Sequence, residues 1–198
     1  MSDATLFHRL AWRVASLLPD GAHGRTVLVT SARHGEGRSY VAGELAAALC
    51  EQTARAVALV DCARVESAAS ARDALALEAG ELREGGTPKT PPAASVVRIA
   101  FGNSDPSSLF RTAGVARTLD VLRSRFAYAV LDGPVLADSG ALSSCTDGTL
   151  LVISAARTRR EIVKGCLQSY PIVRQQLLGA VLNEVPRYVP RWLYQRAL

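Results

Sequence analysis

Six short apolar runs recur along the chain, and none of them alternates with polar residues. They are rich in Val, Ile and Leu and cover residues 26–32, 56–62, 95–101, 128–132, 148–154 and 178–182. Uninterrupted apolar strands are typical of a parallel sheet that is covered on both faces. Helical patterns over residues 39–52, 107–125 and 158–176 separate most of these runs. The alternation predicts an α/β fold: a doubly wound, mostly parallel sheet flanked by helices.

An amphipathic pattern precedes the first strand. Within residues 4–18 the apolar side chains fall on one helical stripe, formed by Leu6, Phe7, Leu10, Val14, Leu17 and Leu18. Pro19, Asp20 and Gly21 end this helix. We therefore expect an N-terminal amphipathic helix within residues 1–20. Its apolar face packs either on its own domain or on a neighbouring molecule, and the pattern does not distinguish these alternatives.

The length and composition are those of one folded domain. The chain has 198 residues, with 48% hydrophobic and 21% charged residues, so we expect a single domain over residues 1–198. Residues 64–94, which include a proline-rich stretch, are predicted to be a surface excursion. No apolar stretch is long enough to span a bilayer, and we expect a cytoplasmic protein.

The basic charge and the cysteines add little to this prediction. The formal charge of +5 comes almost wholly from arginines that are scattered along the chain, so no nucleic-acid partner is expected. The four cysteines of the chain are far apart and form no CxxC pair, which predicts reduced thiols without a zinc site.

Residues 27–40, VLVTSARHGEGRSY, run from a predicted buried strand into a glycine-rich turn and then a helix. Such a loop binds phosphate through backbone N–H groups and the helix N-terminus, while a lysine reaches the β- and γ-phosphates and a hydroxyl holds Mg²⁺. Gly35 and Gly37 provide the close backbone approach, and Ser39 provides the hydroxyl. Arg38 occupies the lysine position, and Ala32 replaces the first glycine. The pattern predicts a phosphate-binding loop with an altered cation.

Two further strands end in a carboxylate. Asp61 ends the run at 56–62, and Asp132 ends the run at 128–132. Because the carboxyl ends of parallel strands meet at one edge of the sheet, both residues are expected beside the glycine loop. An acidic residue at this position fixes the hydration shell of Mg²⁺ in phosphoryl transfer. We therefore predict a magnesium site formed with Ser39 and Asp132.

Several segments, in order, resemble the bacterial tyrosine kinases of capsule and exopolysaccharide synthesis, a branch of the MinD/ParA-like P-loop ATPases. The similar segments are TSARHGEGRSYVAGELAAAL, VDCAR, NSDPSSLF, LDGPVLADSGALSSCTDGTLLVISAARTRRE and LLGAVLNEVP. Each motif alone is weak evidence, but their order and spacing together are specific. The resemblance covers most of the chain.

The resemblance implies ATP or ADP with Mg²⁺ as cofactor. It implies catalytic roles for Arg38, Asp61 and Asp132, and magnesium binding by Ser39 and Asp132. The implied nucleotide-binding residues are Arg33, Gly35, Glu36, Gly37, Arg38, Ser39, Tyr40 and Asn183, with Asn183 at the adenine. Tyr188 and Tyr194 are the implied phosphoacceptors; alternatively, they belong to a basic-aromatic contact or a packed C-terminal helix. For Arg33 we expect either a contact across a dimer interface or a solvated loop position.

The resemblance implies an inner-membrane regulator of polysaccharide chain length as the partner. It leaves open whether the protein also forms a homo-oligomer. Through such a partner the protein is expected at the cytoplasmic face of the inner membrane.

The departures from the family pattern bear on activity. Arg38 replaces the loop lysine, Tyr40 a threonine, His34 a proline, and Ala63 the second aspartate of the second acidic motif. Losing one preorganised transition-state contact costs about 3–4 kcal/mol, or about 10²–10³ in rate. The resemblance therefore predicts a nucleotide-binding or regulatory protein whose phosphoryl transfer is weak or lost. The alternatives are an active tyrosine autokinase that uses Arg38 as its cation, and a MinD/ParA-type positioning ATPase.

Overall fold

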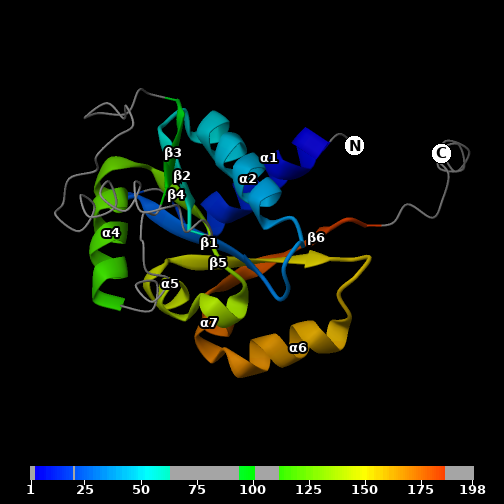
Figure 1. Ribbon diagram of the computed structural model, residues 1–198. Helices are drawn as coiled ribbons and strands as arrows, with labels where there is room; N and C mark the ends of the chain where they lie inside the picture. The colour runs from blue at the N-terminus through cyan, green and yellow to red at the C-terminus, as the bar shows by residue number, and fades with distance from the viewer. Residues whose placement is uncertain (1–2, 20, 63–93, 101–111, 186–198) are drawn as a thin grey trace, which may run out of the picture.

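The computed structural model describes residues 3–19, 21–62, 94–100 and 112–185. Within these ranges the strands form one parallel sheet in the order β3-β2-β4-β1-β5-β6 (Figure 1). The strands are β1 (Arg25–Ser31), β2 (Val57–Asp61), β3 (Val96–Ala100), β4 (Tyr128–Asp132), β5 (Gly148–Ser154) and β6 (Leu177–Asn183). Each predicted strand is present within a residue or two, and the doubly wound α/β fold is confirmed.

Helices cover both faces of the sheet (Figure 1). The helices are α1 (Asp3–Leu17), α2 (Arg38–Thr53), α4 (Thr112–Arg125), α5 (Gly140–Cys145), α6 (Arg160–Ser169), α7 (Pro171–Gln175) and the 3₁₀ helix η2 (Leu136–Asp138). Neighbouring residues of β1 point to opposite faces: Val27 and Val29 pack with α1 and α2, whereas Leu28 packs with α4 and α5. In the central strands β1, β2, β4 and β5 both faces are buried, which explains why these runs do not alternate with polar residues. The edge strands β3 and β6 are more open, and Val96 and Leu182 are exposed.

The N-terminal helix packs on its own domain, which decides between the two alternatives for its buried face. Ala11 and Val14 are fully buried against α2 and the sheet. Leu6 and Leu17, however, are 47% and 45% exposed, so the predicted apolar stripe was too wide. A neighbouring helix covers only a narrow band of side chains, and these two residues lie at its margin. Of the helices that the structure describes, none is both long and apolar enough to cross a membrane.

Three other predictions need correction or lie outside the described ranges. The helix predicted over 158–176 is two helices, because Pro171 lacks a backbone N–H and excludes helical geometry at Tyr170, whose φ and ψ are −125° and 75°. The short helices η2 and α5 were not predicted. The helix predicted over 107–125 is seen from Thr112, since residues 107–111 lie outside the described residues. The predicted excursion at 64–94 also lies outside them, apart from Ala94.

A partly buried carboxylate, Asp147, links β1 to the segment between α5 and β5, at the amino-terminal edge of the sheet. Asp147 Oδ2 accepts hydrogen bonds from the Thr26 amide (2.8 Å), the Thr26 hydroxyl (2.6 Å) and Arg123 Nε (3.2 Å). Burial pushes the pKa of Asp147 upward, but the Thr26 hydrogen bonds and the Arg123 charge outweigh it. The pKa therefore lies below its usual value.

We expect Asp147→Asn to lower the free energy of unfolding by about 1–3 kcal/mol at neutral pH, because it removes a charged acceptor from three donors. Since the pKa is lowered in the folded state, the stabilisation is complete above about pH 4 and is lost as the pH falls through the folded-state pKa. Urea unfolding of both proteins as a function of pH measures this. The control is Asp120→Asn, whose 73% exposed side chain also pairs with Arg123; it should change stability by less than about 0.5 kcal/mol. A constant difference between wild type and Asp147→Asn at every pH would contradict the linkage.

Candidate phosphate-binding site

The glycine loop lies between β1 and α2, at the centre of the sheet. β1 has β4 on one side and β5 on the other, so the connections diverge here and leave a crevice at the carboxyl ends of the strands. Gly35 and Gly37 have φ values of 74° and 88°, a left-handed conformation that favours glycine. A Cβ at Gly37 would also lie 2.0 Å from Asn183 Nδ2. The loop therefore has the local geometry of a phosphate cradle at a helix N-terminus.

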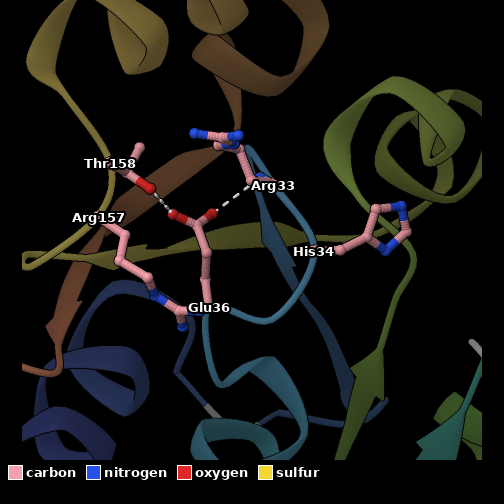
Figure 2. A pocket seen from close by; sticks show the side chains of 5 residues that line it. All are labelled: Arg33, His34, Glu36, Arg157 and Thr158. Atoms are coloured by element: carbon pink, nitrogen blue, oxygen red, sulfur yellow. Dashed lines mark hydrogen bonds between the residues drawn. The ribbon is translucent and has the colours of Figure 1, made fainter.

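Glu36 holds this loop in shape. Its side chain is buried, with 2% of the residue exposed, and its carboxylate accepts three hydrogen bonds. The donors are the amide of Arg33 (2.9 Å), the amide of Ser154 (3.2 Å) and the hydroxyl of Thr158 (Figure 2). Both carboxylate oxygens are thus bonded to protein donors. The side chain braces the loop against β5, and the nucleotide contact implied for Glu36 remains a prediction.

Arg157 forms a second brace, which the sequence analysis did not identify. Its Nη2 donates to the carbonyl of Gly35 and lies 2.8 Å from Glu184 Oε2. A hydrogen bond from Ser154, together with hydrogen bonds and charge from Arg157, lowers the pKa of Glu184. Residues at the carboxyl ends of parallel strands meet at one edge of the sheet, and this rule pointed to Asp61 and Asp132. It could also have identified Arg157, because Arg157 follows the carboxyl end of β5.

Beside the loop lies a pocket of about 150 Å³, lined by Arg33, His34, Glu36, Arg157 and Thr158 (Figure 2). Arg33 is exposed, and His34 extends to the side of the loop away from Glu36. Two arginines and the Glu36 carboxylate line this pocket next to the expected phosphate position, and Arg157 is paired with Glu184. The structure places Arg33 there and leaves both of its expected roles as predictions.

Ser39 and the two acidic strand ends come together, as the sequence predicts. Asp61 and Asp132 are register partners on the adjacent strands β2 and β4, and Ser39 donates a hydrogen bond to Asp132. Asp132 is 7% exposed. Burial raises its pKa and Asp61 adds to the rise, while the Ser39 hydrogen bond and the Arg38 charge act against it.

A hydrated cation fits beside Asp132. Its Oδ1 atom is buried and has no hydrogen-bond partner among the described residues. Ser39 Oγ and this carboxylate are hard oxygen ligands of the kind that Mg²⁺ uses together with water and phosphate. Ser39 would then contact the ion, and Asp132 would hold its water shell.

Three side chains take positions that the sequence did not fix. Arg38 Nη1 donates to the Gly133 carbonyl at 2.6 Å, so the guanidinium reaches from the start of α2 to the residue after β4. The Tyr40 ring packs edge to face on Phe7 of α1, with centroids 5.6 Å apart. Asn183 Nδ2 donates to the Glu36 carbonyl at 3.0 Å, which ties the end of β6 to the loop. Its role at the adenine remains a prediction.

Some predicted site residues lie outside the described ranges. These are Ala63, the two candidate phosphoacceptors Tyr188 and Tyr194, and the segment 103–110. Their roles remain predictions.

A parallel sheet with this strand order, a glycine loop before α2 and an acidic end of β4 define a P-loop NTPase-like domain. Solved structures with the same fold include the kinase domain of the Escherichia coli tyrosine kinase ETK. Its TM-score is 0.74 at 15% identity, with 96% of this chain and 78% of that chain covered. The VpsO kinase domain has a TM-score of 0.71 at 22% identity, covering 92% and 94%. MinD from Pyrococcus horikoshii, solved with Mg-ADP, has a TM-score of 0.57 at 15% identity, covering 88% and 77%.

Sequence comparison gives a more specific result. The tyrosine-protein kinase CpsD of Streptococcus agalactiae is 24% identical over 192 residues, covering 83% of this chain and 77% of that protein. YwqD of Bacillus subtilis, another tyrosine-protein kinase, is 24% identical over 171 residues, covering 80% and 72%. The succinoglycan biosynthesis transport protein ExoP of Rhizobium meliloti is 31% identical over 81 residues, 39% of this chain but 10% of that protein. No protein-family model matches the chain. The resemblance found in the motifs is confirmed: the homologues of this chain are bacterial tyrosine-protein kinases.

Proposed function

We propose that this chain is a nucleotide-binding, tyrosine-kinase-like domain of a capsule or exopolysaccharide system, in which phosphoryl transfer is weak or lost. The observation that carries the proposal is the convergence of Gly37, Ser39 and Asp132 on one site, with Arg38 in place of the lysine. The backbone cradle needs no lysine to attract a phosphate, because amides and the α2 N-terminus supply the attraction. Nucleotide binding can therefore outlast catalysis.

In this proposal the residues of the site have separate roles in binding the nucleotide. The amides of the loop and the Ser39 hydroxyl bind and orient the phosphates, and Arg38 supplies positive charge. Magnesium, when bound, stabilises negative charge on the phosphate oxygens. Asp132 would hold the water shell of such an ion, and Asp61 beside it adds negative charge to the same end of the sheet. Arginine keeps the charge of lysine, but its planar fork is larger than an ammonium, so the transition-state contact is not reproduced.

The names of the homologues support a biological setting for this proposal. CpsD and YwqD are tyrosine-protein kinases, and ExoP is a succinoglycan biosynthesis transport protein. We propose that this chain lies at the cytoplasmic face of the inner membrane, bound to a regulator of polysaccharide chain length. In this arrangement nucleotide occupancy stabilises the shape that docks on the partner.

The proposal is tested by calorimetric titration of ADP and ATP with Mg²⁺, followed by an ADP-formation assay on the same samples, because ADP forms whether the phosphoryl group goes to water or to a tyrosine. We expect saturable nucleotide binding by wild type and no turnover by wild type, Arg38→Lys or Arg38→Ala, because the loss extends beyond one side chain. Turnover by wild type that is nearly kept in Arg38→Lys and abolished in Arg38→Ala would instead establish an active kinase. Absence of binding under all conditions would refute the nucleotide site. Dimerisation that requires ATP would favour the positioning ATPase.

A further inference from the structure

The Arg38 side chain connects the start of α2 to the residue that follows β4. A lysine at this position would not need to make this connection. Arg38 is the first residue of α2, and its Nη1 bonds the carbonyl of Gly133, the residue immediately after Asp132. The side chain is half-buried. Its positive charge is thereby fixed near the carboxyl end of β4, beside the groups that would hold a metal.

The charges around the guanidinium are acidic. Arg38 interacts electrostatically with Asp132, Glu36 and Asp138. Of these three carboxylates, Asp132 has the strongest electrostatic interaction with the guanidinium. The fixed positive charge of Arg38 weakens the attraction between Asp132 and a divalent ion placed beside it.

The guanidinium also retains capacity for a ligand. Within the described residues it has one hydrogen-bond partner, the Gly133 carbonyl, whereas an arginine has five N–H donors in a planar fork. This fork matches the geometry of a phosphate group. Arg38 can therefore stay anchored to β4 and still donate to a phosphate oxygen.

We propose that Arg38 is a tethered cation that takes over the charge-neutralising role of magnesium, so that a nucleoside diphosphate binds independently of divalent metal. This inference rests on the proposed nucleotide site and adds a property to it. The hydrogen bond to Gly133 distinguishes this proposal from a simple replacement of the lysine by another cation. A lysine ammonium, as a compact point charge, would leave the place beside Asp132 to a metal ion.

The first experiment measures the Kd of fluorescently labelled ADP in Mg²⁺ and in EDTA. For wild type we expect the two values to differ by less than about 3-fold, and for Arg38→Lys we expect binding in EDTA to be weaker by at least about 10-fold, on the scale of one lost charge contact. Arg13→Lys, an exposed change on α1, is the matched control and should behave as wild type. Equal magnesium dependence in wild type and Arg38→Lys would overturn the inference.

A second experiment separates this inference from the nucleotide proposal. Mn²⁺ is titrated into nucleotide-free protein and followed by electron paramagnetic resonance. Arg38→Ala should bind Mn²⁺ at least about 10-fold more tightly than wild type, because the competing charge is gone. Adding Asp132→Asn should abolish that gain. If no nucleotide binds to any variant, the proposed function fails and metal-independent nucleotide binding fails with it, while this titration still decides whether the Arg38 charge competes with a metal at Asp132. Equal Mn²⁺ affinity in wild type and Arg38→Ala overturns that competition and with it the inference.

Discussion

Replacing Gly37 by alanine is expected to lower the free energy of unfolding by about 2–3 kcal/mol and to weaken ADP binding by at least about 10-fold. Two costs combine. At a φ of 88° a Cβ meets the neighbouring backbone, which costs about 1–2 kcal/mol. The Cβ would also lie 2.0 Å from Asn183 Nδ2, so the Asn183 side chain must turn away and give up its hydrogen bond to Glu36.

The same helix offers a matched control. Gly43 lies within α2, and a Cβ there would meet nothing within 4 Å. Gly43→Ala should therefore stabilise the protein by up to about 1 kcal/mol through helix propensity, with unchanged ADP affinity. Urea unfolding and calorimetry report the two quantities.

A double-mutant cycle tests the cause of the Gly37 effect. Asn183→Ala removes the side chain that a Cβ at residue 37 would strike, so it should cost less in the Gly37→Ala background than in wild type. Additive losses would mean that the left-handed backbone alone explains the effect. A Gly37→Ala protein as stable as wild type would contradict the loop conformation itself.

Removing the Glu36 carboxylate is expected to be similarly damaging. Glu36→Ala should cost about 2–4 kcal/mol, because it leaves the amides of Arg33 and Ser154 and the Thr158 hydroxyl without their acceptor. Glu36→Gln keeps the shape but presents an NH₂ group to a site that already consists of donors. It should cost about 1–3 kcal/mol.

The location of the damage distinguishes a brace from general destabilisation. Hydrogen exchange at residues 33–37 should accelerate in both Glu36 variants more than exchange in β1, because the loop loses its link to β5 while the central strand keeps its ladder. Glu161→Gln, at an exposed position of α6, serves as the control and should shift stability by less than about 0.5 kcal/mol. Uniform acceleration across the sheet would show that Glu36 acts on the whole domain and not on the loop.

Together these contacts describe a loop whose shape is set before any ligand arrives. Glu36 links it to β5, Arg157 links it to Glu184, and Asn183 links it to the end of β6. A cradle held in this way needs little reorganisation to receive a phosphate, which favours binding. The expected loss of catalysis and the expected retention of binding are therefore compatible within one site.

Some of the site was visible in the chain because its signals are local or follow from topology. The apolar strands end in Asp61 and Asp132, and parallel strands bring their carboxyl ends to one edge, so the meeting of these residues with Ser39 was predictable. The division between α6 and α7 was equally readable at Pro171, but the long helical pattern on either side obscured it.

Other features depend on distances that no pattern in the chain contains. The resemblance implies a nucleotide contact for Tyr40, which remains a prediction; the packing of its ring on Phe7 depends on α1 lying beside α2. The resemblance implies a nucleotide contact for Glu36, which remains a prediction; its side chain accepts hydrogen bonds from Ser154 at the end of β5 and from Thr158 beyond it. The guanidinium of Arg38 donates a hydrogen bond to the carbonyl of Gly133, which is 95 residues further along the chain.

The sequence by itself determined the sheet, its parallel direction, the glycine loop and the edge where the acidic residues gather, because hydrophobic periodicity and backbone conformation act over a few neighbouring residues. Only the tertiary structure decided which way each charged side chain of the loop turns. That choice depends on which donors and acceptors the distant strands β4, β5 and β6 bring within about 3 Å, the range over which a hydrogen bond forms.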